Sequence, residues 1–133
     1  LWQTVPGVLF SLQSDLYSTE LQNETTAKAQ VAKGAVIWRW PPSDIQVRIR
    51  ALFIGNSGST CQVSIGGQST TLTPGYTLGA APGVLWTSGQ LTFSESAAIT
   101  LDSPSTLTPV DVYLTGGSGS PDARLYSLTI EVV

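Results

Sequence analysis

Apolar and polar residues alternate with a period of two along most of this chain. The clearest run covers residues 45–54, in which one face carries Ile45, Val47, Ile49, Ala51 and Phe53 and the other carries Gln46, Arg48 and Arg50. Successive side chains of a strand point to opposite faces, so this pattern predicts a strand with one face in the core. Leu52 and Ile54 are also apolar, and we expect this strand to be covered on both faces near its end.

The same periodicity recurs in short segments separated by turns rich in glycine and proline. It predicts further strands within residues 8–12, 35–40, 61–65, 70–73, 91–93, 99–101, 110–115 and 124–133. Residues 18–33 fit a short helix or an extended strand, and the alternation around Thr25 to Val31 favours the strand. We expect the loop of residues 55–59 to close a hairpin.

These segments amount to about eight or nine strands at intervals of about 8–12 residues, a pattern typical of β-sandwiches and barrels. We therefore predict an all-β fold, an antiparallel, jelly-roll-like β-sandwich. Residues 8–133 are expected to form one domain, preceded by an N-terminal arm of residues 1–7.

Composition narrows the classes of partner. Only 11% of the residues are charged, the net charge is −3, and Lys and Arg together number 6. A nucleic-acid-binding protein needs a basic surface to neutralise phosphates, so we expect no nucleic-acid partner. No apolar run is long enough to span a bilayer, so we expect no membrane partner either. The single cysteine, Cys61, is predicted to be a small buried apolar residue.

The sequence offers little for catalysis. It has no histidine, which excludes Ser-His-Asp and Cys-His arrangements as well as zinc sites that need histidine. Nine carboxylates are spread thinly, and we interpret them as surface residues, with a converging pair as the alternative. We therefore predict a non-enzyme with no cofactor and no metal site. Calcium at a loop is the alternative, with Asp15, Glu20 or Asp122 as ligands.

Three tryptophans are candidate ligand-binding residues. Trp38 and Trp40 are two positions apart and would share one face of a strand. Exposed, they would stack on sugar rings; buried, they would fill the space between two sheets, which we expect for at least one of them. Trp86 lies near a turn and fits either role.

Trp2, Arg48 and Arg50 are candidate partner-interface residues. Trp2 lies on the predicted arm, where it could anchor into a neighbouring subunit. Arg48 and Arg50 form a row on the polar face of the best strand. That row is either a solvated face or a pairing row for carboxylates of a partner chain. Asn23-Glu24-Thr25 matches the glycosylation motif, which we interpret as a chance match.

The order of these features resembles the jelly-roll sandwiches of galactose-binding-like domains and carbohydrate-binding modules. The similarity covers roughly residues 35–133 and consists of Trp38 and Trp40, the Pro-containing turn after them and the long strand of residues 45–54. It also includes a late pair of strands, 110–115 and 124–133, which the resemblance implies to pair with each other and close the sheet. The resemblance implies a sugar site built from exposed aromatic residues and polar loop residues, often beside calcium.

The composition, rich in Ser, Thr, Gly and Val and without disulfides, also resembles that of the capsid decoration (cement) and fibre proteins of tailed phages. That resemblance implies contacts with other virion proteins or with further copies of the chain, often as a trimer. Our first expectation is therefore a non-catalytic virion protein assembled in the host cytoplasm. The alternative is a secreted carbohydrate-binding module.

Overall fold

The computed structural model describes residues 7–13, 21–77 and 93–133. Within these ranges the chain forms strands and loops and no helix. The strands are β1 (Val8–Gln13), β2 (Leu21–Asn23), β3 (Ala29–Ile37), β4 (Asp44–Gly55), β5 (Thr60–Ile65), β6 (Gln68–Leu72), β7 (Tyr76–Thr77), β8 (Ser94–Glu95), β9 (Ile99–Asp102), β10 (Leu107–Thr115) and β11 (Ala123–Val132). The all-β prediction is confirmed, with more strands than the alternation indicated. The segments β2 and β3 also confirm strand rather than helix within residues 21–33.

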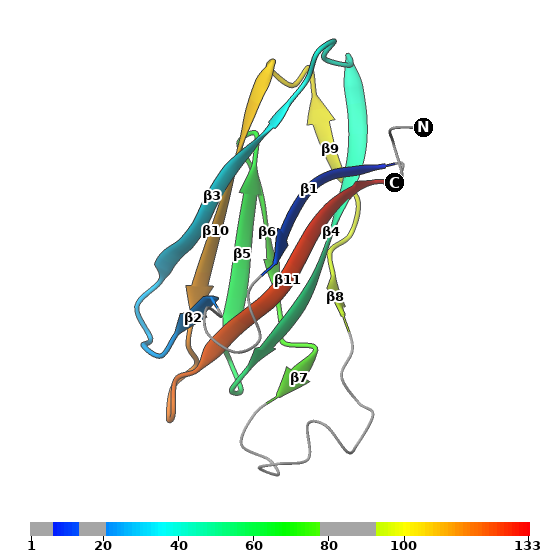
Figure 1. Ribbon diagram of the computed structural model, residues 1–133. Helices are drawn as coiled ribbons and strands as arrows, with labels where there is room; N and C mark the ends of the chain where they lie inside the picture. Colours follow the sequence, from blue (N-terminus) through cyan, green and yellow to red (C-terminus); the bar gives the residue numbers. More distant parts are fainter. Residues whose placement is uncertain (1–6, 14–20, 78–92) are drawn as a thin grey trace.

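The strands form two sheets that pack face to face as a β-sandwich (Figure 1). In the larger, seven-stranded sheet β1, β11, β4 and β7 lie in that order, while β2 pairs with β11, and β8 and β9 pair with β4. The smaller sheet has the order β3, β10, β5, β6. Every pairing is antiparallel except the short contact between β4 and β7, which is parallel. The predicted antiparallel sandwich is confirmed.

The core lies between the two sheets and follows the predicted alternation. Ile45, at the start of the inward face of β4, is partly buried, and the other apolar inward residues of β4, β5 and β10 are fully buried: Val47, Ile49, Ala51, Phe53, Cys61, Val63, Ile65, Val110, Val112 and Leu114. Each buried Val, Leu or Ile side chain contributes about 1.5–3 kcal/mol relative to exposure. Ile54 is buried as well, as expected for a strand covered on both faces near its end.

A β-bulge changes the alternation in β11. Leu125 lies opposite Phe53 of β4, and Ser127 lies opposite Leu52, so Tyr126 is an extra residue between them. Ala123 and Leu125 point into the core before the bulge, and Leu128 and Ile130 do so after it. An extra residue shifts every later side chain to the other face, so a single phase of alternation cannot describe this strand.

Two predicted strand pairings are wrong. Strand β4 pairs with β11 and strand β5 pairs with β10, so the loop of residues 55–59 crosses from one sheet to the other and does not close a hairpin. The last two strands, β10 and β11, likewise lie in different sheets. The hairpin that does form joins β5 and β6 through Gly66 and Gly67, which both have positive φ angles as a tight turn requires.

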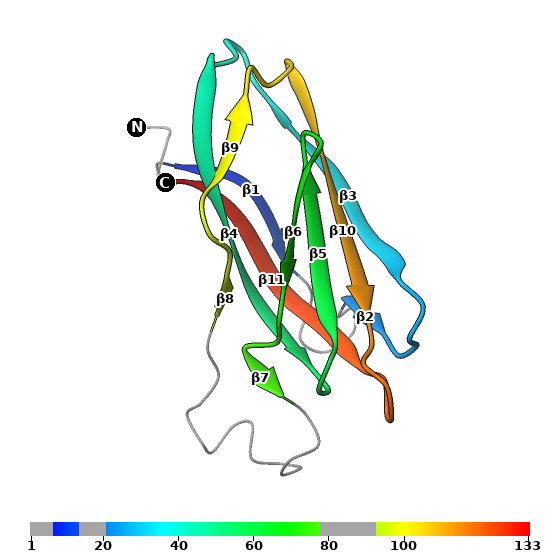
Figure 2. The same ribbon diagram turned by 180° about the vertical axis from the view of Figure 1, so that it is seen from behind.

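Two connections lie at the end of the sandwich that is uppermost in both views, and a third points toward it from below (Figures 1 and 2). Residues 38–43 join β3 to β4, residues 103–106 join β9 to β10, and the β5–β6 turn points toward the same end. The predicted arm, residues 1–7, lies outside the described residues except for Gly7, and the domain boundary stays a prediction. No helix in the described ranges is of a length and hydropathy to cross a membrane.

Candidate functional site

Trp38 and Trp40 occupy different environments, contrary to the expectation that they share a strand face. Strand β3 ends at Ile37, so both tryptophans belong to the loop of residues 38–43, which we call the tryptophan loop. Trp38 is half-buried, packs against the core and donates a hydrogen bond from Nε1 to Thr108 Oγ1 at 3.0 Å. Trp40 is 78% exposed. The expectation that at least one of the pair contacts the core holds for Trp38 alone.

Backbone hydrogen bonds hold the tryptophan loop against the 103–106 loop at both of its ends. The amide of Trp38 donates to the carbonyl of Thr106 at 2.8 Å, and the amide of Ser103 donates to the carbonyl of Ser43 at 2.6 Å. Trp40 lies between these two attachment points along the chain. Its exposed ring is therefore carried by a short loop that is fixed on both sides.

The immediate neighbours of Trp40 restrict its ring and backbone. The guanidinium of Arg39 lies over the Trp40 ring, 4.8 Å from its centroid, in a cation–π contact worth about 0.5–1 kcal/mol at an exposed site. Pro41 follows Trp40 directly, and a residue before proline is restricted to extended conformations. One face of the indole is thus covered. Because the side chain of Trp40 is already restricted, it loses less conformational entropy on ligand binding than an unrestricted side chain would.

A polar depression of about 230 Å³ lies at the same end of the sandwich. It is lined by Gly66, Gln68, Leu101, Asp102, Ser103, Pro104, Ser105 and Thr108. Thr108 connects it to the tryptophan loop, because its hydroxyl accepts the hydrogen bond from Trp38 and donates one to the carbonyl of Ser105 at 2.9 Å. The depression offers carboxylate, amide and hydroxyl groups, which can bind a ligand rich in hydroxyls.

Two carboxylates lie opposite each other beside this depression. Asp44, at the start of β4, is the cross-strand partner of Asp102, at the end of β9. Asp102, through a side-chain hydrogen bond and then through its charge, raises the pKa of Asp44 above its ordinary value. Of the two residues, Asp102 lines the depression, and Asp44 lies opposite it on the neighbouring strand.

Exposed apolar side chains also gather near the end of the smaller sheet. Ile37 of β3 and Leu107 of β10 are direct cross-strand partners, and they are 74% and 59% exposed. Ile37 directly precedes the tryptophan loop. Trp40, Ile37 and Leu107 are the three most exposed large apolar residues that the structure describes, apart from the terminal Val133.

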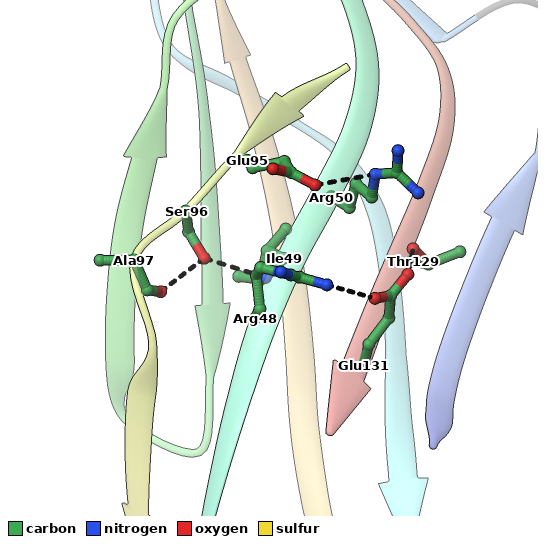
Figure 3. Close-up of polar contacts among 8 residues, drawn as sticks. All are labelled: Arg48, Ile49, Arg50, Glu95, Ser96, Ala97, Thr129 and Glu131. Carbon is green, nitrogen blue, oxygen red and sulfur yellow. Dashed lines mark hydrogen bonds and ion pairs between the residues drawn. The ribbon is translucent and has the colours of Figure 1, made fainter. Parts of the chain in front are cut away.

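The arginine row on β4 lies on the outer face of the larger sheet (Figure 3). Arg48 pairs with Glu131 of β11 at 3.1 Å, and the Nε of Arg50 lies 2.9 Å from a carboxylate oxygen of Glu95 of β8. The second contact is an ion pair without hydrogen-bond geometry at Nε. The guanidinium of Arg50 also lies over the ring of Phe93, 4.3 Å from its centroid. Both arginines therefore have carboxylate partners within their own chain.

The remaining predicted site residues divide into two groups. Trp2, Trp86, Asp15 and Glu20 lie outside the described residues. Asp122 is described, and its two carboxylate oxygens accept hydrogen bonds from Arg124 at 3.0 and 2.8 Å, with a third from Gln22 at 3.1 Å. The hydrogen bonds with Asp122 raise the pKa of Arg124 above its ordinary value. Among the described residues, no group of three or more metal-ligating side chains gathers.

The thiol of Cys61 and the side-chain amide of Asn23 are both buried. Cys61 is fully buried, which confirms its predicted role, and burial raises the pKa of its thiol to about 12. Asn23 is 7% exposed, and its amide nitrogen donates to the carbonyls of Ala27 at 2.8 Å and Leu114 at 2.7 Å. Both amide protons of Asn23 therefore have partners in the folded chain.

Sequence reasoning did not single out Gln68, Asp102, Ser103 or Ser105. Asp102, Ser103 and Ser105 lie in one segment at the end of β9, whereas Gln68 begins β6, more than 30 residues earlier in the chain, and no local motif joins the two. The one available signal was the density of Ser, Asp and Pro in residues 102–105, which indicates a turn. A turn signal alone does not show what the turn faces.

No protein-family description and no curated protein sequence matches this chain. Among solved structures it is similar to a ruminal GH26 endo-β-1,4-mannanase, with 13% identity and a TM-score of 0.46, over 93% of this chain and 26% of that one. It is also similar to dimeric latent PorU from Porphyromonas gingivalis, with 11% identity and a TM-score of 0.50, over 95% and 13% of the two chains.

A third similar structure is the uncharacterized protein lmo2446 from Listeria monocytogenes EGD-e, with 13% identity and a TM-score of 0.44, over 94% of this chain and 11% of that one. The chain thus spans about a quarter or less of the length of these proteins. At such low identity the similarity concerns the fold alone.

Proposed function

We propose that this chain is a non-catalytic binding module whose ligand is a glycan, and that Trp40 is the main contact. The observation that carries the proposal is an indole that is 78% exposed, held on a fixed loop at the same end as a polar depression. Sugar rings combine apolar C–H faces with hydroxyls. An aromatic platform beside carboxylate, amide and hydroxyl groups matches both features.

Each residue then has a distinct role. Trp40 supplies the stacking surface, and Arg39 orients it by covering one face. Gln68 and Asp102, which are exposed, provide hydrogen-bonding groups for hydroxyls. Trp38 is a positioning residue, because its bond to Thr108 ties the tryptophan loop to the depression while its ring packs on the core.

The test compares Trp40→Ala with Trp38→Ala on a glycan array and by calorimetry. Trp40→Ala should keep its stability within about 0.5 kcal/mol, as is usual for an exposed residue. It should also lose at least about tenfold in glycan affinity. Trp38→Ala should lower the free energy of unfolding by about 2–4 kcal/mol, because it removes a packed ring and a hydrogen bond. An array without hits, or full binding by folded Trp40→Ala, would refute the proposal.

A second candidate function is protein–protein contact, as expected for a virion decoration or fibre protein. The exposed cross-strand pair Ile37 and Leu107 favours it, since apolar side chains on a sheet surface are suited to a partner protein. Light scattering separates the two candidates. Self-association of the chain that Ile37→Ser abolishes would support protein contact, and a monomer at all concentrations would count against association of its own copies.

A further inference from the structure

The depression beside the tryptophan loop has a one-sided charge. Asp102 lines it directly, and Asp44 lies opposite Asp102 on the neighbouring strand. No lysine or arginine is among its lining residues. The cation of the tryptophan loop, Arg39, lies over the Trp40 ring and not in the depression. A ligand group that enters this space meets carboxylate oxygens and neutral polar groups.

The size of the depression limits how much of a ligand it can hold. Its volume of about 230 Å³ lies below the range of about 300–1,000 Å³ that is usual for small-molecule sites. It therefore suits one ring of a longer chain, with further rings left on the surface. The exposed Trp40 on the adjoining loop is the available surface for such a neighbouring ring.

We infer that this site selects uncharged sugar units and rejects units that carry a carboxylate, with Asp102 as the specificity-determining residue. The inference rests on the proposed function and names its ligand class. A carboxylate on the ligand would lie close to the Asp102 carboxylate without a cation to neutralise it, whereas a hydroxymethyl group can donate a hydrogen bond to Asp102. Asp102 thus repels the competing ligand and accepts a hydrogen bond from the correct one, and the specificity is the difference between the two binding free energies.

The experiment uses pairs of oligosaccharides that differ only at C6. One pair is β-1,4-linked mannohexaose and the β-1,4-linked mannuronate hexasaccharide, and the other is cellohexaose and the β-1,4-linked glucuronate hexasaccharide. Titration calorimetry at low salt should show that the neutral member of a bound pair binds at least about tenfold tighter than its acidic counterpart. Raising the salt concentration should narrow this difference through screening.

Asp102→Asn keeps the shape of the side chain and removes its charge. This substitution should raise the affinity for the acidic oligosaccharide and so remove most of the affinity difference between the two members of a pair, which we call the gap. The affinity for the neutral oligosaccharide should fall by no more than several-fold, because one hydrogen-bond acceptor is lost. The matched control is Asp111→Asn, on the outer face of the smaller sheet, where Asp111 accepts a hydrogen bond from Gln30. This control should leave the gap unchanged.

The outcomes separate the inference from the function on which it rests. Two outcomes would refute the selectivity but not glycan binding. One is equal or tighter binding of the acidic oligosaccharide, and the other is an affinity difference that does not change in Asp102→Asn. No binding of any of the four oligosaccharides, together with an empty glycan array, overturns both. Thermal unfolding of each variant shows whether a change in binding reflects a loss of folding.

Discussion

Charged side chains on the larger sheet are held by partners of the same chain. Arg48 pairs with Glu131 across neighbouring strands, and Arg124 pairs with Asp122 near the start of β11. These pairs are partly exposed, and such ion pairs contribute about 0–1 kcal/mol each. Their main effect is to neutralise the outer face locally, so this face offers little net charge to a partner. Asp102 differs because none of the ion pairs among the described residues includes it.

The pair of Arg48 and Glu131 makes stability depend on pH. The hydrogen bond from Arg48 lowers the pKa of Glu131 below its ordinary value. A carboxyl with a lowered folded-state pKa stabilises the fold above its unfolded pKa, and this contribution is lost as the pH falls through the folded pKa. Glu131→Gln should therefore lower the free energy of unfolding by no more than about 1 kcal/mol at pH 7.

At a pH below the lowered pKa, wild type and Glu131→Gln should be equally stable. Urea unfolding at the two pH values measures both differences. In an Arg48→Gln background, Glu131→Gln should cost less at pH 7 than in the wild type, and the hydrogen bond that Glu131 accepts from Thr129 at 3.2 Å accounts for the remaining cost. A Glu131→Gln penalty that is the same at both pH values would show that the ion pair is not its cause.

At the scale of the elements, a glycine allows edge strand β3 to pack closely against β1 of the other sheet. Gly34 lies under the ring of Phe10 from β1, and a Cβ at this position would lie 2.6 Å from Cε1 of Phe10 and 3.1 Å from Cζ. Gly34 does not have a positive φ, so its backbone conformation allows other residues. The reason for glycine here is the close approach of the two sheets at one margin of the sandwich.

Gly34→Ala should destabilise the protein by about 1–3 kcal/mol, because the added methyl must displace a ring that packs against the core. In a Phe10→Leu background, which shortens the obstructing side chain, the same substitution should cost less. Denaturant unfolding of the four proteins gives the coupling between the two positions. Equal penalties in both backgrounds would mean that contact with Phe10 is not the reason for the glycine.

The inward faces of the strands were predictable from sequence, and their pairing was not. A period of two assigns Phe53 and Cys61 to the core, and it does so equally for a hairpin and for a connection that crosses between sheets. The connection between β4 and β5 is held by a contact with a residue far away in the sequence. The side chain of Asn56 accepts a hydrogen bond from the amide of Gly117 and donates one to its carbonyl, at 3.0 Å each. Sequence spacing contains no signal for such a contact.

At the scale of the whole molecule, the sandwich separates stability from recognition. The fully buried residues lie in the strands between the sheets, while Trp40 lies in a connection at one end, where connections and strand ends together line the depression. Loops carried on a rigid scaffold can hold a binding site without disturbing the core. This arrangement allows Trp40 or Asp102 to be changed with little effect on folding, which makes the proposed site testable.

The tryptophans show how far the sequence predicts the site. The sequence left two roles open for Trp38 and Trp40, a stacking platform or a place in the core, and Trp40 is exposed as the platform role requires. The sequence could not show that β3 ends at Ile37, and this early end is what places Trp38 and Trp40 in different environments. The polar half of the site depends on the tertiary arrangement of β9, β10 and the β5–β6 turn, so no local pattern reveals it.

The most direct measurement is an NMR titration of the isotope-labelled chain with the best-binding neutral oligosaccharide. We predict that the largest shifts fall on the Trp40 indole and on amides of residues 38–43, 66–68 and 102–108, with small changes on the outer face of the larger sheet. The same titration of folded Trp40→Ala should show weakened shifts at all of these positions. Shifts centred on Arg48 and Arg50, or none at saturating sugar, would contradict a glycan site at the loop end of the sandwich.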